Sequence, residues 1–441
     1  MNPLIPFDKY LSDPEVHVFQ NRVYVYGSQD EENGRRYCPL DYVCYSADST
    51  NLADWKEEGV VYAKTLDPLN RDGRYDLYAP DVVEGNDGFY YLYYAFSSLD
   101  SIRIARSSSP KGPFSFYGEV CYPIGIQKED LPEAPYSFDP ALINDNGHIY
   151  LLMGFSVSFE IEGLDIHSRN NRGAYIVELE EDMKTMKHPP KRIAPGYGYG
   201  KGTSFQDHEF LEAASIRKYD GIYYFIYSSQ AQHELCYATS EDIYGPYTCR
   251  GVLVSNAFEG KLKNNWANNH GSILNIQEDY YIFYHRHTYG KQYSRQLCVE
   301  KLQKEGILFH PVRITSGGIE EVLCKGSYPA AIACFVYDRE EGVFLTFSED
   351  PLDAARIEGE KIVNIKESTV IFRYFAEVKR LKLSVSAEEF SGKVSLYSKN
   401  HFIQTKEIHR EVTFDVDYKK AELELRFSSA FPLTLDSIEV L

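Results

Sequence analysis

One pattern of hydrophobic and polar positions recurs between residue 13 and about residue 315. In each copy a polar residue precedes a short apolar run, a turn and a second, more aromatic run. The clearest copy is residues 209–229, EFLEAASIRKYDGIYYFIYSS, where Asp220 and Gly221 mark the turn. Runs such as IYYFIY are typical of largely buried strands. The pattern therefore predicts a β-hairpin with Glu212 at its mouth.

Four other stretches share this layout and begin at Asp13, Asp81, Asp139 and His270. A second repeat follows three of the hairpins. It consists of small polar residues, a turn, an aromatic residue, and Gly before an apolar pair, and it predicts two outer strands per unit. Four strands repeated radially predict a five-bladed β-propeller. The repeat is longer than the usual propeller period of about 40 to 50 residues, so we expect the excess in loops at 63–78, 123–137, 157–172 and 196–208.

The pattern changes after about residue 316. From Ile332 onward, segments such as RLKLSVS, EVTFDVDY and AELELRFS alternate strictly between apolar and polar residues, as half-buried strands do. This alternation predicts a C-terminal antiparallel β-sandwich. The chain is therefore expected to be all-β, with a propeller at 1–318 and a sandwich at 332–441.

Composition narrows the function. The net charge is −19 and no cluster of Lys and Arg interrupts it, so nucleic acid is not an expected partner. The sequence has no run of 18 consecutive apolar residues, so no membrane-spanning helix is predicted. The N-terminus does not read as a signal peptide, and we therefore expect a cytoplasmic protein. The eight cysteines include no Cys-x-x-Cys pair, which favours buried free thiols over a zinc or redox motif.

The first residues of the hairpins carry the candidate chemistry. If the five units share one register, Asp13, Asp81, Asp139, Glu212 and His270 lie near the propeller axis on one face. Carboxyl groups that lie close together have pKa values that move apart, so one can stay protonated while another is ionised. Hydrolysis of a glycosidic bond needs this combination of an acid and a carboxylate.

These stretches resemble glycoside hydrolase family 43. The resemblance covers about residues 1–315 and rests on five motifs in the family's order: SDPEVHVFQNRVYVYGSQD, DLYAPDVVEGNDGFYYLYYAF, SFDPALINDNGHIYLLMG, FLEAASIRKYDGIYYFIYSS and NNHGSI. It implies a five-bladed arabinofuranosidase or xylosidase that inverts configuration in a single displacement by water. The acid and base are then expected about 6.5 to 9.5 Å apart, with no covalent intermediate.

The resemblance implies a role for each carboxyl group. Asp13 would be the general base, Glu212 the general acid, and Asp139 the third acid that tunes and orients Glu212. Read alone, Asp13 and Asp139 would each be half of an Asp-Pro turn. Glu209 is the competing acid, and its context does not match the family, so we interpret it as a loop carboxylate.

Other ring and channel residues have implied roles as well. His270 resembles the family's channel histidine, often found beside a calcium or sodium ion, although a hydrogen-bonded structural histidine is the alternative. Tyr78, where the family commonly has tryptophan, would stack on the sugar or simply pack the channel. Arg295 would contact sugar hydroxyls or form an ion pair. Asp81 is read as a scaffold residue, and no cofactor is required for the chemistry.

The C-terminal segment loosely resembles a family 6 carbohydrate-binding module, although no Trp follows Trp266 and a purely structural accessory domain is the alternative. The expected function is an inverting exo-glycosidase that removes terminal α-L-arabinofuranosyl, or β-D-xylosyl, residues from plant cell-wall oligosaccharides. Loops 157–172 and 196–208 would close one end of the channel and favour exo-action. The alternatives are a galactosidase, an endo-arabinanase, or a propeller that binds sugars without catalysis.

Overall fold

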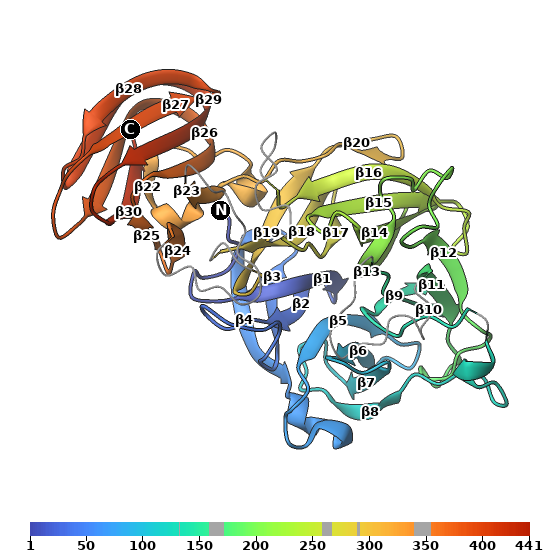
Figure 1. Cartoon of the computed structure of the whole chain (residues 1–441). Coiled ribbons are helices and arrows are strands. Elements are labelled where there is room, and N and C mark those ends of the chain that lie inside the picture. The colour runs from blue at the N-terminus through green and yellow to red at the C-terminus, as the bar shows by residue number, and fades with distance from the viewer. Residues whose placement is uncertain (132, 158–171, 258–266, 289–291, 339–353) are drawn as a thin grey trace.

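The computed structural model describes residues 1–131, 133–157, 172–257, 267–288, 292–338 and 354–441. Five small antiparallel sheets form a ring, and a larger antiparallel sheet, orange to red in Figure 1, follows at the C-terminus. The all-β prediction, with a five-bladed propeller followed by a C-terminal β-domain, is confirmed. Most of the predicted loop 157–172 lies outside the described residues.

Four of the five propeller sheets have the predicted four strands in simple meander order. Their strands are β1 (Leu11–Phe19), β2 (Arg22–Gln29), β3 (Tyr42–Asp48) and β4 (Asn51–Tyr62); β5 (Leu77–Glu84), β6 (Tyr90–Phe96), β7 (Ile102–Ser107) and β8 (Ser115–Glu119); β9 (Ala141–Asp145), β10 (His148–Met153), β11 (Gly173–Glu178) and β12 (Lys191–Pro195); and β13 (Phe210–Tyr219), β14 (Ile222–Ser229), β15 (Glu234–Ser240) and β16 (Thr248–Ser255). Short 3₁₀ turns lie in the loops and at the junction: η1 (Lys64–Leu66), η2 (Pro68–Asn70), η3 (Lys128–Asp130), η4 (Gly318–Glu320) and η5 (Ala330–Ile332).

The aromatic runs follow from burial on both faces of each sheet. In β6, Tyr90, Leu92 and Tyr94 pack in the cluster shared with the first sheet, whereas Tyr91 and Tyr93 pack in the cluster shared with the third. Alternate side chains of a strand point to opposite faces, so a strand between two neighbouring blades must be apolar at every position. Five such clusters, one per pair of neighbouring sheets, close the ring.

The fifth sheet departs from the prediction, because it contains three described strands: β17 (Gly271–Ile276), β18 (Asp279–His287) and β19 (Arg295–Leu302). The N-terminal segment hydrogen-bonds to the outer edge of β19, where Leu4 N donates to Leu297 O at 2.9 Å and Val299 N donates to Asn2 Oδ1 at 2.9 Å. The side chain of Asn2 also donates to Glu300 Oε1 at 2.8 Å. The beginning of the chain therefore occupies the edge where a fourth strand was expected.

The C-terminal domain is one nine-stranded antiparallel sheet around its own hydrophobic cluster. Its described strands are β22 (Gly326–Pro329), β23 (Phe335–Asp338), β24 (Arg356–Glu358), β25 (Lys361–Ile365), β26 (Ser368–Ser386), β27 (Lys393–Ser398), β28 (His401–Glu407), β29 (Glu411–Ser428) and β30 (Leu433–Val440), while the short pair β20 (Lys304–Glu305) and β21 (Leu308–Phe309) precedes it. The long strands β26 and β29 pair along most of their length and carry register shifts. The sheet curls around the core to form the layers of the sandwich (Figure 1).

The C-terminal domain packs against the fourth and fifth blades. Cys334, Phe335 and Ile371 join the hydrophobic cluster between these blades. Buried Arg286 of β18 donates to the carbonyl oxygens of Ala331 and Ala333, each at 2.9 Å. The two parts of the chain therefore share a core and buried hydrogen bonds.

Candidate active site

The candidate catalytic residues lie where the innermost strands begin. Asp13 and Glu212 lie near the beginnings of β1 and β13, and Asp139 lies just before β9. The backbone leaves regular geometry at each point, with positive φ angles of 51° at Asp13, 45° at Asp139 and 64° at Ala213. Non-glycine residues adopt this region rarely, and such strain concentrates at functional sites. β-Bulges beside Asp13 and Glu212 turn these side chains out of the strand alternation.

Asp13 is buried against a guanidinium group. Its Oδ1 accepts a hydrogen bond from Arg295 Nη1 at 2.7 Å, and His285 Nδ1 lies 3.5 Å from the same oxygen. Burial would raise the pKa of Asp13, but the charge of Arg295 holds it well below the usual range of an aspartate. Asp13 is therefore a buried, ionised carboxylate.

Arg295 is itself held in place by a second carboxylate. Its Nε donates to Asp30 Oδ2 at 2.8 Å and its Nη2 donates to Asp30 Oδ1 at 3.0 Å, which forms a bidentate pair. The ring of Tyr37 lies 4.8 Å from the guanidinium carbon, and Cys38 Sγ lies 3.1 Å from Nη2. The guanidinium group of Arg295 is thus fixed by Asp30, with its Nη1 directed at Asp13.

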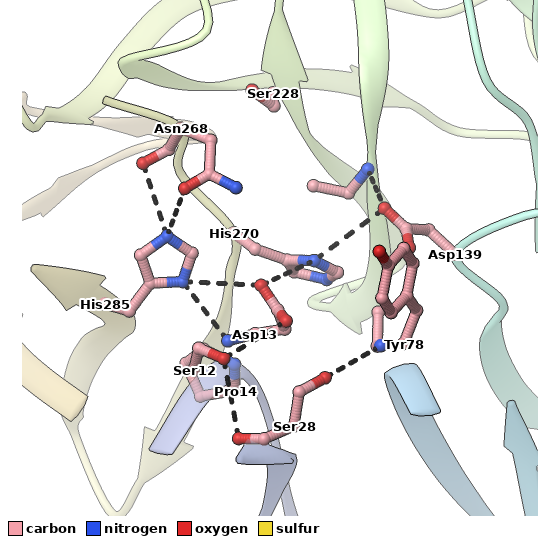
Figure 2. Close-up of polar contacts among 12 residues, drawn as sticks. Ser12, Asp13, Pro14, Ser28, Tyr78, Asp139, Ser228, Asn268, His270 and His285 are labelled. Atoms are coloured by element: carbon pink, nitrogen blue, oxygen red, sulfur yellow. Dashed lines mark hydrogen bonds and ion pairs between the residues drawn. The ribbon is translucent and has the colours of Figure 1, made fainter. Parts of the chain in front are cut away.

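Two imidazoles surround the carboxylates (Figure 2). His270 Nδ1 lies 3.9 Å from both Asp13 Oδ1 and Asp139 Oδ2, so this ring stands between the two acids. His285 Nδ1 accepts from Asp13 N at 3.2 Å, and its Nε2 faces Asn268 Oδ1 at 3.2 Å. Burial lowers the pKa of His270 to about 4 and that of His285 well below its usual value. Both rings are therefore neutral at physiological pH.

Glu212 and Asp139 are the two carboxyl groups of the site whose pKa values are raised. Burial and the negative charge of Asp13 raise the pKa of Glu212 to about 7. Burial, and then the charges of Glu212 and Asp13, raise the pKa of Asp139 well above its usual value. Asp139 Oδ2 accepts from Ala213 N at 2.8 Å, so it also fixes the backbone directly after Glu212. The three carboxyl groups thus divide into one anion and a pair that retains a proton.

Tyr78 lies beside this group on β5. Its ring packs edge-on against Phe138, with the centroids 5.8 Å apart, and its carbonyl oxygen accepts from Tyr42 Oη at 2.7 Å. Tyr78 as a whole is half-buried. The next residue, Ala79, donates its N–H to Ser28 Oγ at 2.9 Å, which ties this strand to the first blade (Figure 2).

A second group of charges fills the channel. His17 Nε2 lies 2.5 Å from Asp81 Oδ1, and Asp81 Oδ2 accepts from Leu142 N at 2.6 Å. Arg217 Nη2 donates to Glu15 Oε2 at 2.7 Å. Asp81 therefore joins three blades, as its reading as a scaffold residue predicts, and the guanidinium of Arg217 balances the acids around it.

The fit of an ion at His270 is limited by the donors present. His270 Nε2 is buried and has no hydrogen-bond partner among the described residues. Calcium binds six to eight oxygen ligands, and no group of three ionisable ligands in the described part of the chain includes His270. These residues therefore do not form a direct calcium site, although the unpaired nitrogen fits a water molecule.

Several residues of the site were not found from the sequence. Cys38, in a loop, and His285, inside a strand, contact Asp13 directly, whereas Asp30, at a strand end, acts on Arg295. His285 belongs to YYIFYHRH, which reads as a core strand. The consecutive polar residues His285, Arg286 and His287 at the end of this strand are the one sign in the sequence of a polar site. Only the fold shows that His285 faces Asp13.

Comparison with known proteins gives the same picture. Residues 1–306 match the glycosyl hydrolases family 43. A xylosidase/arabinosidase from Thermoclostridium stercorarium is 40% identical over 414 residues, which cover 87% of this chain and 85% of that protein. The crystal structure of a β-xylosidase/α-arabinofuranosidase from a compost microbial metagenome, in complex with xylotriose, is 27% identical with a TM-score of 0.54 and covers 71% of this chain and 97% of that chain.

The propeller, with its carboxyl groups where the innermost strands begin, and the match to this family define a glycoside hydrolase. The chain belongs to glycosyl hydrolases family 43, as the sequence motifs indicate. An arabinoxylan arabinofuranohydrolase from Bacillus subtilis, at 19% identity and a TM-score of 0.53, covers 100% of this chain and 97% of its own. That likeness shows a shared fold over the whole length, the C-terminal domain included.

Proposed function

We propose that this enzyme is an inverting exo-glycosidase that removes terminal α-L-arabinofuranosyl, or β-D-xylosyl, residues from plant cell-wall oligosaccharides. The observation that carries the proposal is the opposite charge state of two neighbouring carboxyl groups, an ionised Asp13 beside Arg295 and a Glu212 whose pKa is raised to about 7. Relatives described as xylosidase/arabinosidase support the choice of sugars.

Asp13 is the general base and Glu212 the general acid in this proposal. A water molecule attacks the anomeric carbon while Asp13 accepts one of its protons. At the same time the glycosidic C–O bond breaks, and Glu212 gives its proton to the leaving oxygen. Asp139 positions Glu212 by accepting a hydrogen bond from Ala213 N, and burial with the charge of Asp13 keeps Glu212 protonated.

The supporting residues have narrower proposed roles. Tyr78, a half-buried residue, offers its ring to the sugar in the first subsite. Arg295 acts mainly through Asp13, because Asp30 and Asp13 already occupy most of its N–H groups. Any ion at His270 would be held through water, and no step of the reaction depends on it.

We propose the division into a catalytic propeller at 1–318 and an accessory β-domain at 332–441. Whether that domain binds carbohydrate stays a prediction. All eight cysteines lie in the described ranges and are free thiols, although Cys121 and Cys324 are exposed rather than buried. Free thiols are usual in reducing compartments, which supports a cytoplasmic enzyme acting on short oligosaccharides. No helix among the described residues is long and apolar enough to cross a membrane.

The first test compares release of nitrophenol from the α-L-arabinofuranoside and the β-D-xyloside, with Asp13→Asn as the blank. We expect turnover of at least one substrate and a loss of about 10²- to 10⁴-fold in the variant. Proton NMR of the first sugar released should show the inverted anomer. Retention of configuration, or wild-type activity in Asp13→Asn, contradicts the assignment, and silence on both substrates favours another glycoside or the binding-only reading.

A further inference from the structure

A second cluster of reactive side chains lies on the fourth blade, outside the channel. It consists of His208, just before β13, with Glu234 and Cys236 at the start of β15. His208 Nδ1 lies 3.0 Å from Glu234 Oε2 and 3.7 Å from Cys236 Sγ, and the thiol lies 3.8 Å from the same carboxylate oxygen. One nitrogen, one oxygen and one sulfur therefore converge from two separate segments.

These separations match one face of a metal tetrahedron. Zinc binds imidazole nitrogen and carboxylate oxygen at about 2.0 to 2.1 Å and thiolate sulfur at about 2.3 Å. Tetrahedral angles then place pairs of ligands about 3.3 to 3.6 Å apart. The three observed edges deviate from this range by a few tenths of an ångström, so small side-chain rotations bring all three atoms to bonding distance.

The surroundings hold the carboxylate of Glu234 and the backbone of His208 in place and leave a path for an ion. Ser229 Oγ donates to Glu234 Oε2 at 2.8 Å, and Tyr227 Oη donates to the backbone oxygen of His208 at 2.7 Å. Such outer hydrogen bonds orient metal ligands. The side chain of His208 is 30% exposed and that of Glu234 is 18% exposed, whereas Cys236 is buried. An ion can thus enter from solvent and retain a water molecule opposite the sulfur.

We propose that His208, Glu234 and Cys236 form a site for zinc or a similar thiophilic divalent cation, with water as the fourth ligand. On binding, the S–H bond of Cys236 breaks and its proton passes to solvent, and His208 offers the unprotonated Nδ1 lone pair. No oxidant or reductant takes part. The absence of a Cys-x-x-Cys pair hid this site from the sequence, because its ligands come together only through strand pairing.

The bound ion would cross-link two elements near the active site. His208 ends the loop 196–208, and Phe210, which pairs with Ser229, begins the strand that carries Glu212. Glu234 and Cys236 belong to the third strand of the same blade. A metal between them would fasten the entry of β13 to β15, which would raise the thermal stability of the blade.

The test is titration of the tag-free, full-length enzyme with Co²⁺, followed by Zn²⁺ competition. The background is Cys121→Ser/Cys324→Ser, which removes the exposed thiols. We expect one equivalent of Co²⁺ to produce a thiolate-to-cobalt charge-transfer band that Zn²⁺ abolishes. Cys236→Ser should lose the band, and His208→Gln should weaken binding at least about tenfold, since even outer partners of a metal contribute that much.

The matched control is His148→Gln. His148 Nδ1 lies 2.7 Å from Glu178 Oε1, so this is a histidine–glutamate pair on another blade that the control can remove in the same way. It should leave the band unchanged. Circular dichroism establishes that each variant is folded. Absence of a charge-transfer band in the parent, or a band that persists in folded Cys236→Ser, overturns the proposal.

Discussion

At the scale of single residues, the site depends on one arginine that gives two carboxyl groups different charges. Arg295 is 2.7 Å from Asp13 and keeps it ionised, and that anion in turn raises the pKa of Glu212. The same desolvation would otherwise protonate both acids. Because Asp30 fixes the guanidinium on its other side, this division is a property of the folded site before any sugar binds.

The pH dependence of kcat/KM follows from this division. Glu212 must be protonated to give its proton away, so activity is retained below its pKa of about 7 and falls as the pH rises through that value. Asp13 stays ionised far into the acid range, because its pKa is lowered. We expect a limb that declines about tenfold per pH unit above neutrality. A profile that still rises above pH 8 would contradict the role of Glu212.

Replacement of the acid should have an effect that depends on the leaving group. Glu212→Ala should slow hydrolysis of natural oligosaccharides by about 10²- to 10⁴-fold, but should slow nitrophenyl glycosides much less, because a good leaving group departs without protonation. Steady-state kinetics on both substrates measures the difference. Glu209→Ala is the control, since Glu209 lies three residues away and accepts from Gly198 N and Gly200 N. Equal losses on both substrates would sink the assignment.

At the scale of elements, β13 is the strand that carries the proposed acid, Glu212. Two register shifts interrupt its pairing with β14 around Glu212, and Ala213 has a φ of 64°. Asp139 of the neighbouring blade accepts from Ala213 N and holds this irregular segment in place. The strand and the loop before β9 therefore position the acid together.

Asp139→Asn tests whether Asp139 acts through its hydrogen bond and not through a charge. The amide oxygen can still accept from Ala213 N, and because the pKa of Asp139 is raised well above its usual value, the wild-type group is already uncharged where Glu212 titrates. We expect the alkaline limb of kcat/KM to stay in place, with only a modest loss of kcat. Asp139→Ala removes the hydrogen bond as well and should lower kcat at every pH. A limb that moves to lower pH in Asp139→Asn would show instead that a charge on Asp139 holds the proton on Glu212.

The sequence predicts these elements well where burial dictates them. Continuous aromatic runs such as Tyr90–Tyr94 require cover on both faces, and the repeat of such runs gave the number of blades. The same patterns say nothing of which polar atoms meet across blades. Contacts between segments far apart in the chain bring Asp30, His285 and the cluster at His208 to their partners. The third strand of the last blade likewise hydrogen-bonds to residues 2–4.

At the scale of the whole molecule, the junction of the two domains is built on Arg286. Its side chain is buried and donates to the carbonyl oxygen of Ala331, in η5, and to that of Ala333, directly after η5. It also donates to Gln296 Oε1 at 3.0 Å. Removal of a buried partner leaves these oxygens unsatisfied, at about 1 to 3 kcal/mol each. The propeller and the C-terminal domain are therefore expected to unfold together in the wild type.

Arg286→Met should uncouple them. We expect calorimetry to show a lower first transition and a separate second one, with a loss of about 2 to 5 kcal/mol in the free energy of unfolding. Arg313→Ala is the matched control, because Arg313 Nη1 pairs with Glu422 at 3.1 Å at an exposed position of the same junction. Exposed pairs contribute about 0 to 1 kcal/mol. A single unshifted transition in Arg286→Met would mean that the apolar contacts alone hold the domains.

The closure of the ring by the N-terminal segment has a consequence for synthesis. The side chain of Asn2 donates hydrogen bonds to Val299 O, Glu300 Oε1 and Thr315 O. These partners lie 297, 298 and 313 positions further along the chain. On a ribosome, residues 2–4 must wait with unpaired backbone groups until the fifth blade has emerged. The first four blades can pair locally as they appear, whereas the last seam requires the longest loop to close. Residues 2–4 are thus made before the blades and placed after them, and the nascent propeller remains an open arc for most of its translation.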